Sequence, residues 1–66
     1  MKKTIFVKPT SLREYHCNVN PRVIEWDETE KGNLRITFDS SIPVPAAKAH
    51  QAKQLGLDEL AAYPHS

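Results

Sequence analysis

Residues 22–39, RVIEWDETEKGNLRITFD, contain two runs of alternating apolar and polar residues around the turn sequence EKGN. Such alternation is typical of antiparallel strands that bury one face, and Gly32 can supply the positive φ that closes a hairpin. In the register that we predict, two apolar pairs lie on one face and an opposite-charge pair on the other. The predicted pairs are Trp26 with Leu34, Ile24 with Ile36 and Glu25 with Arg35, with Asp27 opposite Asn33. This hairpin is the predicted centre of the fold.

Two further segments in the first third of the chain alternate in the same way. Residues 3–8 place Ile5 and Val7 on one face and Phe6 on the other. Residues 15–19 place Cys17 on the apolar face and leave His16 exposed. We therefore expect an antiparallel meander of three to four strands over residues 1–39.

The remaining residues change in character after the hairpin. Residues 40–45, SSIPVP, are predicted to form an extended linker, because each proline disfavours helix in the residue before it. Residues 45–63 are predicted to form one C-terminal helix packed on one face of the sheet. A break at Gly56 is favoured over the alternative of a helix that continues through this glycine. The chain is thus expected to be a single α+β domain over residues 1–66.

The segment AKQLGLDELAAY, residues 52–63, also has the outline of a helix-turn-helix DNA-reading element. Its second helix would be too short to lie along a major groove. Asp58 and Glu59 would stand at the end that meets the nucleic acid and would repel phosphates. We favour a capped helix followed by one extra turn that closes the core.

Length and charge restrict the classes of function. A chain of 66 residues has room for one small core and for no sizeable enclosed pocket. The formal net charge is +1, but the first 22 residues are basic and the next 11 acidic, which gives the molecule a charge dipole. The single cysteine and the interrupted apolar run after the first lysines lead us to expect a soluble, cytoplasmic protein without a membrane segment.

No arrangement of residues in the sequence predicts catalysis or metal binding. His16 and Cys17 are adjacent, but neighbouring strand residues point to opposite faces, so we expect Cys17 to be a buried apolar residue. The three histidines lack the spacing of metal ligands, and the carboxylates of DETE fall in a solvated turn. We expect no catalytic residue, no metal, no cofactor and no small-molecule substrate.

The outer face of the predicted sheet is the candidate site. We predict a partner-binding surface of Lys2, Phe6, Lys8 and His16 for another protein or for self-association. The alternative is a nucleic-acid surface, because aromatic and basic residues together form single-strand platforms. That surface would comprise Lys2, Lys3, Phe6, Lys8 and Arg13. A single exposed phenylalanine is also common on surfaces that bind nothing. The leading hypothesis is a non-catalytic interaction or accessory module.

The opening residues 3–9, KTIFVKP, together with a later Val-Pro ahead of a leucine-containing stretch, resemble a group of very short proteins encoded beside the tail genes of Mu-like prophages. The likeness covers seven residues, and the Gly-rich middle and the aromatic-Arg segment of that group are missing here. No residue roles are carried across. The resemblance implies a bacterial or phage-encoded accessory protein.

Overall fold

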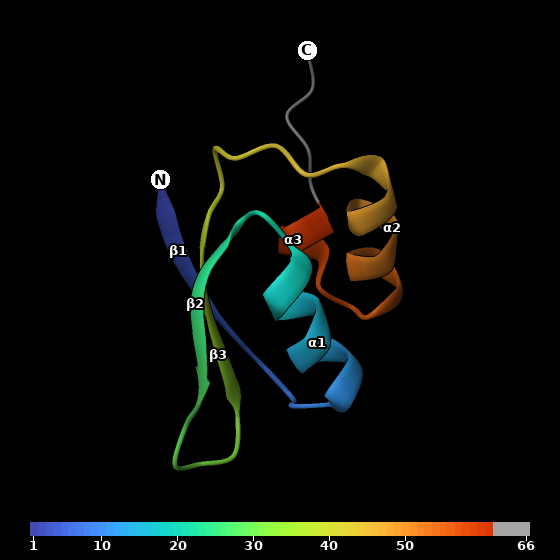
Figure 1. The fold of residues 1–66 in the computed structure, drawn as a ribbon. Helices are drawn as coiled ribbons and strands as arrows, with labels where there is room; N and C mark the ends of the chain where they lie inside the picture. The colour runs from blue at the N-terminus through green and yellow to red at the C-terminus, as the bar shows by residue number, and fades with distance from the viewer. Residues whose placement is uncertain (62–66) are drawn as a thin grey trace.

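The computed structural model describes residues 1–61, so the predicted helical residues 62 and 63 lie outside the described range. Within this range the chain forms a three-stranded antiparallel sheet and three helices. Along the chain these are β1 (Lys2–Val7), α1 (Ser11–Val19), β2 (Val23–Glu28), β3 (Leu34–Asp39), α2 (Ala46–Gln54) and α3 (Asp58–Ala61). The helices all lie on one side of the sheet (Figure 1). The predicted α+β class with an antiparallel sheet is confirmed.

The order of the strands differs from the predicted meander. β3 is the central strand, and β1 and β2 pair with it on either side. Because both run antiparallel to β3, β1 and β2 are parallel to each other, and α1 connects them across the helical side of the sheet (Figure 1). The chain therefore begins with a split β-α-β unit, into which β3 inserts.

The strand predicted at residues 15–19 is wrong, because these residues belong to α1. Thr10 caps this helix: its backbone is extended and its hydroxyl oxygen accepts a hydrogen bond from the amide of Arg13 at 3.1 Å. The helix buries His16 and Cys17 and leaves Leu12 and Tyr15 exposed. Leu12, Tyr15 and Val19 recur at the spacing of one helix face, but the side of α1 that is buried, with His16 and Cys17, is turned away from that face.

The predicted hairpin is present, but its register is wrong by two residues. Thr29 pairs with Asn33 through a backbone bond of 2.8 Å, and the amide of Gly32 donates to the Thr29 carbonyl at 2.9 Å. Trp26 lies opposite Ile36 and Asp27 opposite Arg35, and the pairing is interrupted by a bulge between Val23 and Glu25. The three predicted pairs, Trp26–Leu34, Glu25–Arg35 and Ile24–Ile36, are therefore not formed. The shift of two residues keeps Glu25 and Trp26 on their predicted faces. The bulge, in contrast, turns Val23 toward the core and leaves Ile24 47% exposed, so the predicted burial of Ile24 is wrong.

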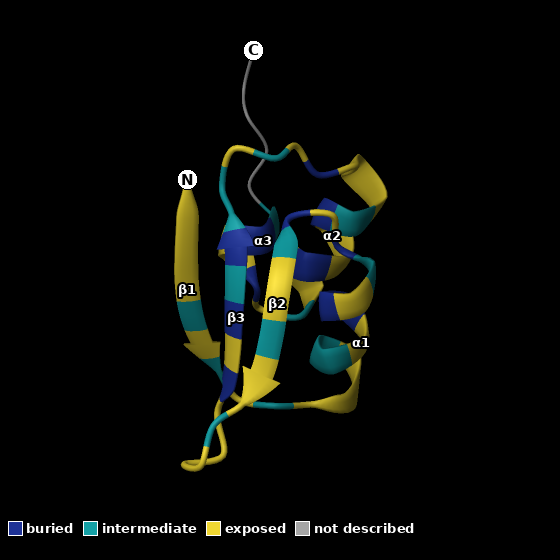
Figure 2. Ribbon diagram, turned by 60° about the vertical axis from the view of Figure 1, so that its left-hand side comes forward, coloured by how far each residue is buried: buried dark blue, intermediate teal, exposed yellow. Residues whose placement is uncertain are grey.

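The core lies between β3 and the helices. Figure 2 shows β3 alternating between buried and more exposed residues, whereas most of β1 is exposed. The largest apolar side chains of the core are fully buried, and they come from β3, from the turn after α2 and from α3. They are Leu34, Ile36, Phe38, Leu57 and Leu60. The strand β1 thus adds only the half-buried Ile5 and Val7 to this core.

Polar side chains also hold the helices and the sheet together. Arg22 is 3% exposed, and its guanidinium donates to the carbonyls of Ile42 at 2.7 Å and Glu59 at 3.0 Å. Asn20 accepts from the amide of Arg22 at 2.9 Å and donates to the Leu60 carbonyl at 3.3 Å. These bonds join the start of β2 to the linker after β3 and to α3. Burial of such groups is tolerated because their hydrogen bonds are made.

The chain between α2 and α3 is a tight turn at Gly56, which has φ +76. α2 ends at Gln54, and the amide of Leu57 donates to the Ala52 carbonyl at 2.8 Å, as in a glycine-terminated helix. Leu57 and Leu60 both face the core. None of the described helices has the length and apolar composition needed to cross a membrane.

Candidate functional site

The four residues predicted to bind a partner do not form one surface. Lys2 and Phe6 lie on the outer face of β1, the side away from the helices, and Lys8 follows at the end of the strand. Phe6 is 59% exposed. His16 is only 2% exposed and lies in α1 on the opposite side of the sheet, so its predicted exposure is wrong. The structure therefore places Lys2 and Phe6 on one face of β1 and excludes His16 from the predicted surface.

The outer face beside Phe6 carries charges of both signs. Phe6 pairs with Arg35 of β3, whose guanidinium binds the Asp27 carboxylate of β2 with an Nε–Oδ1 distance of 2.8 Å. This hydrogen bond lowers the pKa of Asp27 from its ordinary value. Glu25 lies on the same face as Asp27. The face is thus acidic toward β2 and basic toward β1.

The set predicted for nucleic-acid binding is also divided. Lys3 lies on the face of β1 opposite to that of Lys2 and Phe6. The Arg13 side chain is occupied within the fold: its Nε donates to the Leu55 carbonyl at 2.9 Å and its Nη1 to the Lys8 carbonyl at 2.7 Å. Arg13 therefore fastens the end of α2 to the segment after β1.

The outer side of β1 is a free strand edge. The amide of Ser40 donates to the Met1 carbonyl at 3.0 Å, which makes Met1 and Ser40 a hydrogen-bonded pair of the ladder. Because such pairs alternate in an antiparallel ladder, Lys3, Ile5 and Val7 bond to β3, whereas the amides and carbonyls of Lys2, Thr4 and Phe6 point away from it. No segment within residues 1–61 pairs with this side of β1. We call these outward-facing groups the β1 edge.

The other edge of the sheet, along β2, differs in shape and charge. The bulge between Val23 and Glu25 interrupts its ladder, and bulges twist an edge strand away from a new partner. Its exposed residues include Glu25, Asp27 and Glu28. The indole of Trp26 donates to the Asn18 side chain of α1 at 3.2 Å and holds the helix against this strand. The β1 edge is the regular one, since its six residues pair with β3 in an uninterrupted register.

Beneath the β1 edge lies an open groove of about 410 Å³. It is lined by residues 4–7 of β1 and residues 56–59 of the α2–α3 turn and the start of α3, and we call it the β1–α3 groove. Its apolar wall includes the half-buried Ile5 and Val7 and the buried Leu57. Asp58 and Glu59 are exposed on its α3 side. The groove gives the strand edge an adjacent apolar surface.

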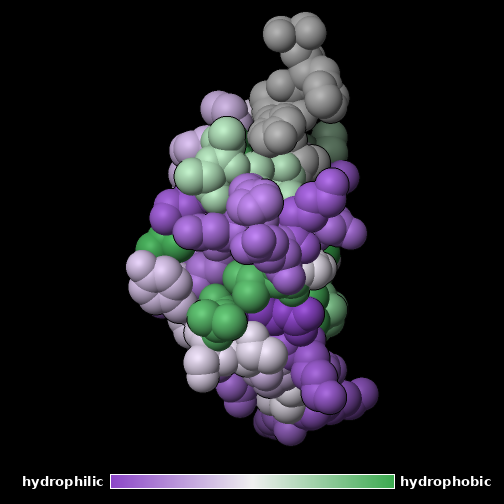
Figure 3. Space-filling model, turned by 90° about the vertical axis from the view of Figure 1, so that its right-hand side faces the viewer, coloured by the Kyte–Doolittle hydropathy of each residue, from purple (hydrophilic) through white to green (hydrophobic). Residues whose placement is uncertain are grey.

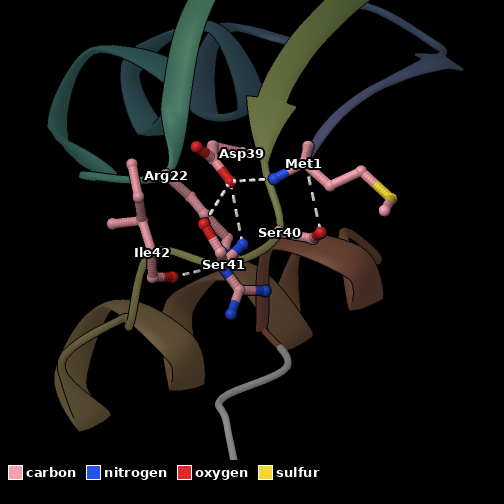
Figure 4. A network of polar contacts seen from close by, with 6 residues as sticks. All are labelled: Met1, Arg22, Asp39, Ser40, Ser41 and Ile42. Atoms are coloured by element: carbon pink, nitrogen blue, oxygen red, sulfur yellow. Dashed lines mark hydrogen bonds and ion pairs between the residues drawn. The ribbon is translucent and has the colours of Figure 1, made fainter.

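A network of polar contacts fixes the beginning of β1. The terminal amine of Met1 binds the Asp39 carboxylate at 2.8 Å, and Ser41 donates to the same oxygen through its amide at 2.9 Å and its hydroxyl at 2.6 Å (Figure 4). These hydrogen bonds hold the pKa of Asp39 well below its usual range. The ladder continues past them to Ser40. The first residues of the edge strand are therefore tied to the end of β3.

A second apolar surface lies between α1 and α2, and the sequence did not predict it. Leu12 and Tyr15 of α1 are 67% and 63% exposed, and with Leu55, Gln51 and Gln54 they line a groove of about 230 Å³. Figure 3, which views the molecule from the side where α2 lies, shows apolar surface between strongly hydrophilic side chains. The sequence does contain a signal for this surface. Pro9 and Thr10 are typical of a helix start, and a helix over residues 11–19 would place Leu12 and Tyr15 on one face.

The buried titratable groups of α1 are held in their neutral forms. The His16 Nε2 atom accepts from the Asn20 amide at 2.9 Å, which leaves the ring proton on Nδ1. Burial and the nearby Lys48 charge lower the pKa of His16. Burial and the Glu14 carboxylate raise the pKa of the Cys17 thiol to about 11. A thiol with such a pKa is a weak nucleophile at neutral pH.

Within residues 1–61, no group of three or more histidine, cysteine or carboxylate side chains is placed to hold a metal ion. Compared with protein-family models, with curated proteins and with solved structures, the chain matches none of them.

Proposed function

We propose that this chain is a non-catalytic protein-interaction module that binds an extended segment of a partner along the β1 edge. The observation that carries the proposal is the regular, unpaired edge with outward amides and carbonyls at Lys2, Thr4 and Phe6. A strand added there gains backbone hydrogen bonds, and its side chains alternate between the outer face and the β1–α3 groove. An accessory role in a bacterium or a phage, acting in the cytoplasm, is part of the same proposal.

Phe6 supports the proposal as an anchor. An aromatic side chain that is 59% exposed beside a strand edge gives a partner strand a large apolar surface on the outer face. The groove on the inner face offers Ile5, Val7 and Leu57. In strand addition the backbone hydrogen bonds usually provide affinity, and the surfaces that contact alternate side chains provide selectivity.

Nucleic acid is the alternative ligand, and the presence of Lys2 and Phe6 on the same face of β1 favours it. The acidic residues Glu25 and Asp27 on the same face, and the use of Arg13 inside the fold, weigh against it. Titration of a labelled single-stranded oligonucleotide at low salt decides between the two. Flat curves remove the alternative, whereas salt-dependent binding that is lost in a Phe6→Ala/Lys8→Glu variant would favour it.

The proposed function is tested by closing the edge without touching the core. Thr4→Pro removes an outward amide and places a ring on the edge, whereas the bonds from β1 to β3 at Lys3 and Ile5 stay in place. The matched control is Thr4→Val, which removes only the hydroxyl that lies 3.4 Å from the Thr37 hydroxyl. Phe6→Pro is a second edge-closing variant. Circular dichroism confirms that each variant is folded.

Each variant and the original chain are then used to capture proteins from a cell lysate, with identification by mass spectrometry. The proposal expects a partner that the original chain and Thr4→Val retain and both proline variants lose. Hydrogen exchange of the purified complex should show new protection at the amides of Thr4 and Phe6. Partners retained equally by the proline variants would refute binding at the β1 edge.

A further inference from the structure

The charges around the β1 edge restrict which extended segment can bind there. Lys2, Lys3 and Lys8 all belong to β1 or its immediate end, and residues 1–8 contain no acidic residue. The acidic residues on the outer face are Glu25 and Asp27 of β2, which β3 separates from β1 by about 9–10 Å, and Asp39 of β3. Asp39 lies opposite Lys2, but its carboxylate is bound by the Met1 amine and by Ser41. Asp27 is already paired with Arg35. A segment lying on the free side of β1 is therefore closest to the lysines.

The two faces of the edge favour different side chains. On the outer face a bound strand would lie beside Lys2, Phe6 and, at the end of β1, Lys8. On the inner face its side chains would enter the β1–α3 groove, against Val7 and Leu57. Asp58 and Glu59 at the α3 side of this groove would repel a carboxylate placed there. Acidic residues are thus favoured on the outer face and apolar residues on the inner face.

The same lysines disfavour a second copy of the chain as the occupant. Antiparallel pairing of two β1 strands around a two-fold axis would place Lys2, Lys3 and Lys8 of both copies along one seam. Like charges that face each other across strands destabilise the pairing, and edge lysines are a common protection against it. The β2 strand of a second copy is acidic, but its bulge disfavours regular pairing.

We infer that the β1 edge binds an extended segment of another protein in which acidic residues alternate with apolar ones, the acidic residues on the outer face and the apolar residues in the β1–α3 groove. This inference rests on the proposed function, because it names the partner of the same edge. The alternation follows from strand geometry, because consecutive side chains of a bound strand point to opposite faces.

The test is a selection from a phage-displayed library of short random peptides against the immobilised 66-residue chain, with the Thr4→Pro variant as counter-selection. Enriched peptides are synthesised, and their binding is measured by fluorescence anisotropy at ~0.05 M and ~0.5 M salt, across which charge screening rises strongly. The charge variant is Lys2→Glu/Lys8→Glu. Its matched control, Lys31→Glu/Lys53→Glu, changes net charge equally on the hairpin turn and on α2.

The inference expects enriched peptides with alternating acidic and apolar residues. Their affinity should fall roughly tenfold or more in Lys2→Glu/Lys8→Glu and at high salt, and change little in the control. Peptides that require an open edge but show no acidic enrichment would overturn the inference and leave the proposed function standing. If no peptide binds the original chain more tightly than it binds Thr4→Pro and Phe6→Pro, both the inference and the proposed function are refuted.

Two other outcomes would move the interaction elsewhere. Peptides whose binding is lost in Leu12→Ser, and kept in Thr4→Pro, would assign binding to the α1–α2 groove and overturn the inference. A dimer in light scattering that Thr4→Pro converts to a monomer would show that a second copy occupies the edge, and that result also overturns it.

Discussion

Replacing Arg22 by methionine should unfold most of the protein, although the change keeps an unbranched side chain of moderate length. The Arg22 guanidinium makes two charge-assisted hydrogen bonds to backbone carbonyls, those of Ile42 and Glu59. Such bonds contribute about 1.5–3 kcal/mol each, so the loss of both costs about 3–6 kcal/mol. A small core supplies about 3–5 kcal/mol in total. The free energy of unfolding should therefore fall close to zero.

Urea denaturation followed by circular dichroism measures this effect. With a slope of ~1 kcal/mol/M for a chain of this size, the midpoint should fall by ~3 M or more. Arg35→Met is the matched control, because Arg35 is exposed and binds only Asp27 in the described chain. Its midpoint should change little. If Arg22→Met shifts the midpoint no further than Arg35→Met does, the buried bonds of Arg22 do not hold the helices to the sheet.

Three further predictions concern α1 and the two glycines. Because the pKa of His16 is lowered in the folded state, folding favours the neutral ring, and stability should decline as pH falls below ~6.5. Urea midpoints between pH 8 and 5 should show this decline, and His16→Gln should remove most of it. If the midpoint of His16→Gln falls with pH as steeply as that of the original chain, the burial of the neutral ring is contradicted. Gly32→Ala should cost ~1–2 kcal/mol through its φ of +81 alone, and Gly56→Ala more, because its new Cβ would also lie 3.2 Å from the Arg13 side chain. Equal melting temperatures for the two variants would refute this comparison. Cys17, whose thiol has a pKa of about 11, should react slowly with a thiol reagent until urea unfolds the chain, and fast reaction of the native chain would contradict the burial of the thiol.

The hairpin was predictable from the sequence because its turn and its alternation agree. Gly32 identified the turn, and the apolar residues of β3 all face the core as expected. The register was not predictable from the cross-strand pairs alone, because a shift of two residues preserves every face. Asp27 is as good a partner for Arg35 as Glu25, and the bulge at Ile24 gives no signal in the apolar pattern.

The apolar residues of α1 fit a helix as well as a strand, because Leu12, Tyr15 and Val19 recur at the spacing of one helix face. The buried side of this helix includes His16 and the following Asn20, which hydrogen-bond to each other, whereas Leu12 and Tyr15 are exposed. Alternation of Tyr15, Cys17 and Val19 therefore suggested a strand. Tertiary hydrogen bonds, which no local pattern encodes, decide which side of this helix is buried. The wrong prediction of a meander has the same origin. A strand at residues 15–19 would allow neighbouring strands to pair in chain order, whereas a helix between β1 and β2 connects them as parallel strands by a crossover.

The candidate site was partly predictable. The outer face of β1 was assigned by alternation, and Lys2 and Phe6 lie on it. The sequence could not show that β1 is an edge strand, because its only sheet neighbour, β3, follows it by more than 25 residues of chain. The groove beneath it depends on where α3 packs, which is again a tertiary property.

Hydrogen exchange along β1, followed residue by residue by NMR on the isolated chain, tests the free edge most directly. The amides of Lys3, Ile5 and Val7, which bond to β3, should exchange at least ~10-fold more slowly than those of Lys2, Thr4 and Phe6. Equal protection of Thr4, Phe6 and Ile5 would mean that both sides of β1 are already paired, and the edge would have no place for a partner.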